Sequence, residues 1–67
     1  MKIKVNGEAY EIVSGISLLE LLAEKGLNPQ MVVVELNYSI VSRDQWDATV
    51  LKEEDNVEIL AFVGGGC

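Results

Sequence analysis

The dipeptide Asn6-Gly7 stands between two short segments that alternate apolar and polar residues, and it constrains the fold more than any other local feature. Both residue types accept the positive φ angles of a type I′ turn, which joins two antiparallel strands tightly. A two-residue turn places Ile3 opposite Tyr10 on one face and Lys2 opposite Glu11 on the other. Because the turn chemistry and both faces agree, the sequence predicts a β-hairpin at its start.

One segment carries the signals of a bounded helix. Ser17 and Glu20 have the spacing of a capping box, in which each side chain accepts a hydrogen bond from the other residue's backbone N–H. Gly26 suits the left-handed position that follows a helix C-terminus. The apolar residues between these ends share one helical face: Leu18, Leu21 and Leu22. We therefore predict a short helix that buries this leucine face.

The rest of the sequence predicts further strands. Residues 31–36 are rich in β-branched side chains, residues 40–41 form a short strand after a turn, and residues 57–63 form the final strand after a polar turn. Residues 42–45 have the spacing of a second capping box, which predicts one helical turn that leads to Trp46. We interpret Trp46 as the packing anchor of that turn.

The order of these elements indicates an α+β fold. A hairpin, a helix and the later strands give a mixed sheet of four to five strands. One main helix cannot cover both faces of such a sheet, so it packs on one face. With the first and last strands parallel in the middle, this is a β-grasp arrangement. We assign residues 1–63 to this domain and residues 64–67 to a flexible glycine-rich tail.

Composition argues against several classes of function. Five basic and eleven acidic residues give a formal net charge of -6, which disfavours nucleic acid because phosphate contacts need lysine and arginine. No apolar run is long enough to span a bilayer, and a single cysteine favours a reducing, cytoplasmic setting. Without histidine, a metal site or a nucleophilic catalytic site has few candidate residues. We therefore expect a protein that is not itself an enzyme and binds no metal or cofactor of its own.

Three consecutive glycines, Gly64, Gly65 and Gly66, follow the final strand and precede Cys67. They have no side chains to pack, so this tail is either a frayed end or a segment that a partner threads into a narrow site. The second interpretation has a chemical use. A terminal carboxylate is a poor electrophile until an ATP-dependent partner adenylates it, after which a sulfur nucleophile can attack.

The chain also contains a set of residues in short motifs: Asn37, Ile40-Val41, Arg43-Asp44-Gln45-Trp46, Leu51, Asp55, Val57-Glu58-Ile59 and Phe62-Val63-Gly64-Gly65-Gly66. Over its whole length, this set resembles the ThiS family of sulfur carriers in thiamine biosynthesis, which have a ubiquitin-like β-grasp fold. The resemblance implies that a ubiquitin-activating-type enzyme uses ATP to adenylate Gly66, which then becomes a thiocarboxylate. It further implies a sulfur donor such as a cysteine desulfurase, delivery of the sulfur to thiazole synthase, and threading through Gly64 and Gly65.

The chain departs from the family pattern at three positions. Ser42 replaces a common proline and Tyr38 a common turn glycine, and we expect both changes to affect only turns. Cys67 follows the glycine at which the family normally ends. We consider three interpretations of Cys67: an extension that a peptidase removes, a thiol that takes part in sulfur chemistry, or an artefact of sequence assignment.

The final strand also suggests a docking surface. Leu60 and Phe62 are predicted to share the open face of the sheet with Glu58, and exposed apolar side chains on such a face mark a docking patch. We assign Leu60, Phe62 and Val63 to partner binding. The opposite, helix-covered face of this strand is expected to hold Val57, Ile59 and Ala61.

Two other functions stay open at this point. The chain could be a related sulfur carrier for molybdopterin or cysteine-type biosynthesis, and Cys67 favours the cysteine-type pathway, whose carriers can bear residues after the diglycine. Alternatively, it could be a ubiquitin-like interaction module that is never activated.

Overall fold

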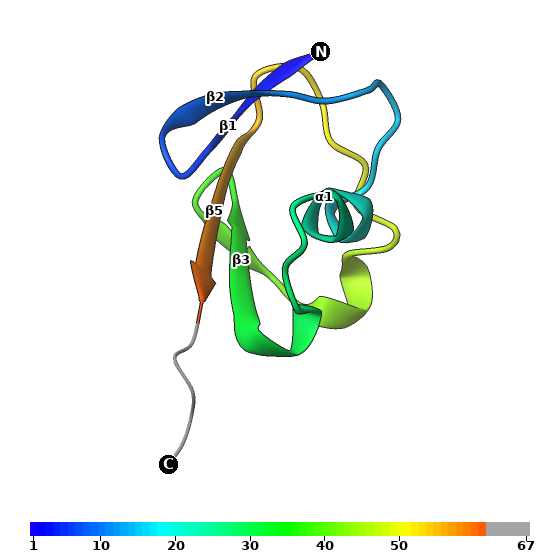
Figure 1. The fold of residues 1–67 in the computed structure, drawn as a ribbon, viewed down its shortest axis with the longest axis vertical. Coiled ribbons are helices and arrows are strands. Elements are labelled where there is room, and N and C mark those ends of the chain that lie inside the picture. Colours follow the sequence, from blue (N-terminus) through cyan, green and yellow to red (C-terminus); the bar gives the residue numbers. More distant parts are fainter. Residues whose placement is uncertain (62–67) are drawn as a thin grey trace.

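The computed structural model describes residues 1–61, which form one mixed sheet with a helix across one of its faces (Figure 1). The strands are β1 (Lys2–Val5), β2 (Glu8–Glu11), β3 (Val32–Leu36), β4 (Ser39–Val41) and β5 (Asn56–Ala61). The helical elements are α1 (Leu18–Glu24) and two 3₁₀ turns, η1 (Pro29–Met31) and η2 (Arg43–Gln45). The strand order is β2-β1-β5-β3-β4, and β1 runs parallel to β5. The predicted α+β class, the mixed sheet and the central parallel pair are confirmed.

The first hairpin has the predicted turn and register. Asn6 has a φ of 51° and Gly7 a φ of 84°, as a type I′ turn requires. Ile3 lies opposite Tyr10, and Lys2 lies opposite Glu11. The one ion pair within 4 Å among residues 1–61 joins Glu11 to the N-terminal ammonium of Met1 instead, at 3.5 Å. The cross-strand placement of Lys2 and Glu11 is therefore confirmed, but no ion pair joins them.

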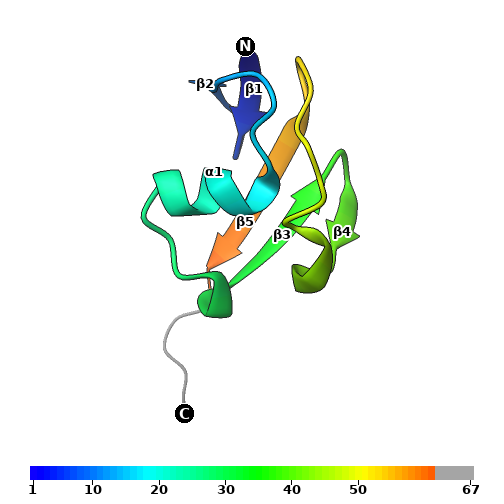
Figure 2. The ribbon, with the colours of Figure 1, turned by 90° about the vertical axis from the view of Figure 1, so that its right-hand side faces the viewer.

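Helix α1 begins and ends where the sequence predicts. The Glu20 backbone N–H donates to Ser17 Oγ at 3.1 Å, and the Ser17 N–H donates to Glu20 Oε1 at 2.9 Å. Gly26 follows the helix with a φ of 73°. The predicted leucine face is fully buried, and it packs in one core with side chains from the inner face of the sheet: Ile3, Val5, Val34, Val57 and Ile59. Figure 2 shows α1 crossing the sheet on this side only.

The segment after β4 contains a correction. The predicted helical turn is present as η2, but Ser42 makes no capping hydrogen bond. Its Oγ donates to Asp44 Oδ1 at 2.8 Å, so the second capping box is wrong. The predicted role of Trp46 is confirmed, because its side chain is buried and its Nε1 donates to the Val41 carbonyl at 2.9 Å.

The last strand starts one residue earlier than expected. Asn56, which was assigned to the polar turn, already pairs with Lys4 of β1. Val57 and Ile59 face the core as predicted, whereas Ala61 is exposed although its register partner, Val32, is buried. Phe62, Val63 and the domain boundary predicted after Val63 lie outside the described residues.

Candidate functional site

Strand β5 leads directly to the segment that carries the predicted chemistry. It lies at the centre of the sheet, between β1 and β3, and its last described residue is Ala61. Gly64, Gly65, Gly66 and Cys67 lie outside the described residues, as do Phe62 and Val63 of the predicted docking surface. The structure therefore shows how β5 is held before the tail begins, and it tests the exposure of one of the three docking residues, Leu60.

Asn6 holds β5 from one side. Its backbone N–H donates to the Val57 carbonyl at 2.8 Å, which extends the parallel ladder by one residue. The chain then turns away at Gly7, and the Asn6 Oδ1 accepts the next β5 hydrogen bond, from the Ile59 N–H at 2.8 Å. A side-chain oxygen thus takes the place of a missing strand carbonyl, so the β5 backbone stays bonded to within two residues of Ala61.

Asn37 holds β5 from the other side. Its backbone N–H donates to the Asn56 carbonyl at 2.7 Å, and its Oδ1 accepts from the Asn56 N–H at 2.9 Å. Its Nδ2 donates to Asp55 Oδ1 at 3.1 Å, while Asp55 Oδ2 accepts from the Lys52 N–H. The resemblance to the ThiS family included Asn37 and Asp55 without giving them a role. The structure shows that they fix the start of β5.

The face of the sheet away from α1 carries exposed apolar residues. Leu60 is 57% exposed, as the predicted docking surface requires, and Ile40 of β4 is 70% exposed. Ile40 was not predicted to lie on this surface, although the alternation of β3 places its register partner, Glu35, on the open face. With Val32 and Val34 buried, Val33 and Glu35 must face outward.

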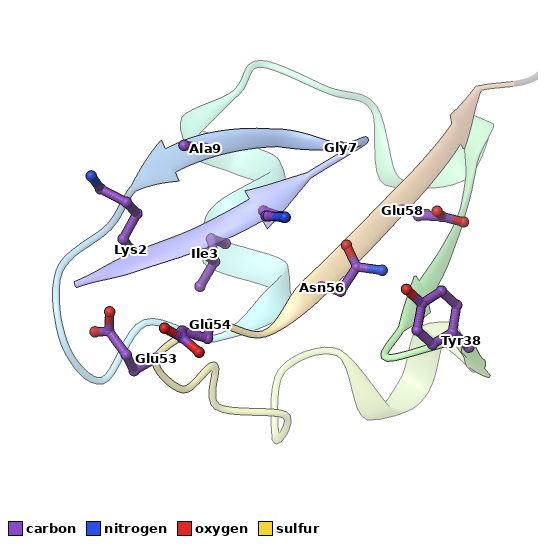
Figure 3. A pocket seen from close by; sticks show the side chains of 10 residues that line it. Lys2, Ile3, Gly7, Ala9, Tyr38, Glu53, Glu54, Asn56 and Glu58 are labelled. Atoms are coloured by element: carbon purple, nitrogen blue, oxygen red, sulfur yellow. The ribbon is translucent and has the colours of Figure 1, made fainter.

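A hollow lies on the same open face, beside β1 and the start of β5 (Figure 3). Tyr38 and Glu58 border one side, and Lys2 and Glu53 lie at the other, with Asn56 between them. Tyr38 comes from the turn after β3, has a φ of 72° and is 78% exposed. Local sequence patterns do not predict this hollow, because its lining comes from three separate parts of the chain.

Residues 1–61 contain no group of three or more His, Cys, Asp or Glu side chains that could hold a metal ion. None of the helices within this range is both long and apolar enough to cross a membrane. What residues 1–61 provide is a firmly bonded central strand that ends beside an exposed face.

Comparison with known proteins gives this arrangement a context. The model of the ThiS family matches residues 3–66. A thiazole synthase of Magnetococcus marinus is 44% identical over 66 residues, which are 98% of this chain and 20% of that protein. The sulfur carrier protein ThiS of Bacillus subtilis is 36% identical over 50 residues, which are 75% of this chain and 76% of that protein. The chain thus spans about a fifth of the thiazole synthase and most of the carrier.

A solved structure supports the same relationship. The thiamine biosynthesis protein ThiS of Geobacter metallireducens superimposes with a TM-score of 0.82 at 39% identity, over 98% of this chain and all of that one. The ubiquitin-like β-grasp fold expected from the sequence is thereby confirmed. Since the family match covers nearly the whole chain and the fold agrees with it, this protein belongs to the ThiS family.

Proposed function

We propose that this protein is a sulfur carrier of thiamine biosynthesis and that it carries sulfur as a thiocarboxylate on Gly66. The observation that carries the proposal is the family match, which extends through residue 66 and so includes all three tail glycines. The position of β5 supports it, because a central strand bonded on both sides gives the tail a fixed base. The protein is then a co-substrate of other enzymes rather than an enzyme.

The proposed chemistry takes place in two steps at the Gly66 carboxylate, once Cys67 has been removed. The carboxylate first attacks the α-phosphate of ATP on a ubiquitin-activating-type enzyme, forming an acyl adenylate and releasing pyrophosphate. A donor such as a cysteine desulfurase supplies sulfur as a persulfide, and a thiol reductant, which becomes a disulfide, releases it at the level of sulfide. This sulfide then adds to the acyl carbon. The bond between the acyl carbon and the phosphate oxygen breaks, AMP leaves, and a thiocarboxylate remains. Gly64 and Gly65 thread the tail into the enzyme, because any Cβ would widen it.

Thiazole synthase is the proposed recipient of the sulfur. Thiazole synthases of Magnetococcus marinus and Paramagnetospirillum magneticum each match 98% of this chain over a fifth of their own length. A segment similar to this chain therefore occurs within the same polypeptide as a protein of that name. Such a covalent link keeps two segments at high effective concentration, which supports a working partnership between a carrier of this kind and the synthase.

The intact mass of the protein isolated from its native cells tests this proposal. We expect a species that ends at Gly66, part of which has one oxygen replaced by sulfur. Deleting the adenylating enzyme should leave the trimmed form and remove the sulfur. A protein that keeps Cys67 and gains no sulfur when the adenylating enzyme is present would contradict the proposal, and would favour an interaction module that is never activated.

A further inference from the structure

The sheet formed by residues 1–61 has two open edges, β2 and β4, which lie at the two ends of the strand order. An edge strand presents unpaired backbone N–H and C=O groups that another strand can bind. β2 begins with Glu8 and ends with Glu11, both exposed, and charged side chains of this kind oppose pairing with a second acidic strand. β4 is the sequence Ser-Ile-Val, without a charged side chain. Only the β2 edge is therefore protected by charge.

Ile40 is the residue of β4 whose backbone groups point away from the sheet. The second hairpin has a two-residue turn, so Leu36 and Ser39 form its first hydrogen-bonded pair. Bonded and non-bonded pairs alternate in an antiparallel ladder, so the next pair, Glu35 and Ile40, exchanges no hydrogen bonds. The Ile40 N–H and C=O consequently face outward, and no other backbone group within residues 1–61 bonds to them. One donor and one acceptor are thus free at the middle of this edge.

The side chain of Ile40 adds an apolar surface to the same edge. It is 70% exposed, although isoleucine is among the residue types that are most often buried. Figure 2 shows β4 at the border of the sheet, with no other strand beside its outer edge. A strand that pairs with β4 therefore gains backbone hydrogen bonds along the edge and an apolar contact on the open face.

We propose that two copies of this protein pair antiparallel along β4, about a two-fold axis at Ile40. In this arrangement the Ile40 N–H of each protomer donates to the Ile40 C=O of its partner, so the free groups of one copy satisfy those of the other. The two Ile40 side chains lie next to each other on the open face of one continuous sheet. Ser39 of each protomer lies opposite Val41 of its partner. No like charges are opposed along β4, which makes a second copy a suitable occupant of this edge.

The short length of β4 and the charge of the protein determine the strength of the dimer. Three residues span only about 10 Å, whereas a stable interface buries about 800 Å² on each partner. The dimer is therefore weak and reversible, with a dissociation constant of roughly 0.1–1 mM. Each copy carries a net charge of -6, so added salt strengthens the association by screening the repulsion.

Pairing along β4 leaves the central strand β5 uncovered by the second copy. β4 and β5 are both antiparallel to β3, so they run parallel to each other. In the antiparallel dimer the two β5 strands consequently point in opposite directions, and β3 and β4 separate each of them from the shared edge. The pairing does not depend on the proposed sulfur-carrier function, and either can fail without the other.

The test is self-association of the full chain, measured by sedimentation equilibrium between about 20 µM and 1 mM. A thiol reductant keeps Cys67 from forming an intermolecular disulfide. Ile40→Lys places two like charges side by side at the axis and should raise the dissociation constant about tenfold or more. The matched control is Leu60→Lys, which changes the net charge equally and replaces an exposed apolar residue of the central strand. It should change the dissociation constant less than about twofold.

Amide hydrogen exchange of the unaltered protein gives a second measurement that does not depend on the folding of a variant. The Ile40 N–H should exchange about twofold or more slowly at 1 mM than at 20 µM, because the partner's carbonyl accepts it in the dimer. The internal control is the other edge. By the same alternation after the Asn6-Gly7 turn, the N–H groups of Ala9 and Glu11 point outward from β2, and their exchange should not change with concentration.

Three outcomes would overturn the proposed pairing. The first is a chain that stays monomeric at about 1 mM. The second is an equal loss of association in Leu60→Lys and Ile40→Lys, which would mean that the copies meet through the open face rather than along the edge. The third is slower exchange of Ala9 and Glu11 together with Ile40, because β4 would then pair with β2 of the other copy.

Discussion

The two hairpins of this protein have turns with the same left-handed backbone geometry but different residues. Both turns contain an asparagine followed by a second residue, and all four residues have φ between 51° and 84°. Asn6 precedes Gly7 in the first hairpin, whereas Asn37 precedes Tyr38 in the second. Each asparagine donates its N–H to a β5 carbonyl and accepts a β5 N–H on its Oδ1. The two turns therefore hold the central strand from opposite sides.

The second turn residue shows where the hairpins differ. Glycine adopts a left-handed backbone without steric cost, but for other residues this conformation costs about 1–2 kcal/mol. Tyr38 takes it with an exposed side chain, so little packing offsets the strain. The comparison teaches that the asparagine is the shared requirement of the two turns, because it bonds to β5. The residue after it is free to vary at a modest cost in stability.

The largest expected effect comes from replacing Asn6, because its hydrogen bond with Ile59 is partly buried, whereas the side-chain bonds of Asn37 are exposed. Replacing Asn6 by glycine keeps the turn geometry but leaves the Ile59 N–H without its acceptor in a partly buried position. We expect the free energy of unfolding to fall by about 2 kcal/mol, measured by urea denaturation. Asn6→Asp is the control, since it keeps an acceptor and tolerates positive φ. If N6G were as stable as N6D, the bond to Ile59 would contribute nothing to stability.

A smaller effect is expected on the other side of β5. Asn37→Gly removes the acceptor of the Asn56 N–H and the donor to Asp55, but both bonds are exposed and water can replace them. We expect a loss of about 1 kcal/mol in the same denaturation experiment. A loss larger than that of Asn6→Gly would contradict the view that burial, rather than the number of bonds, sets the difference between the turns.

The smallest effect is a gain. Tyr38→Gly relieves the left-handed strain, and the extra entropy of glycine in the unfolded chain offsets part of that gain, which leaves about 0.5 kcal/mol. For a domain of this size, we expect the thermal midpoint to rise by about 2–4 °C. The reciprocal variant Gly7→Tyr should lower it, although a Cβ at Gly7 meets no atom within 4 Å. A lower midpoint for Tyr38→Gly would show that the tyrosine side chain packs favourably enough to outweigh its strain.

Local signals predicted the first hairpin and α1 well. The Asn6-Gly7 turn, the Ser17–Glu20 capping box and the leucine face of α1 each depend on residues a few positions apart, and the structure confirms all three. The same method was wrong at Ser42, where the spacing of a capping box was present. There the hydroxyl bonds the nearby Asp44 carboxylate instead, and a 3₁₀ turn of three residues follows. Short polar residues have several local partners, so spacing alone does not decide between them.

The sequence by itself determined the elements except η1, whose Met31 was predicted to begin a strand, together with the buried leucine face, the outward position of Leu60 and, through its motifs, the family. Only the tertiary structure decided that Asn6 bonds to Ile59, 53 positions away, and that Glu35 meets Glu58 across two strands. It also brought Tyr38, Lys2 and Glu53 to the border of one hollow. The physical reason is the separation along the chain over which each kind of interaction acts. Periodicity and capping act between neighbours in the chain, whereas cross-strand pairs and side-chain bonds to a distant strand exist only once the sheet has set its register.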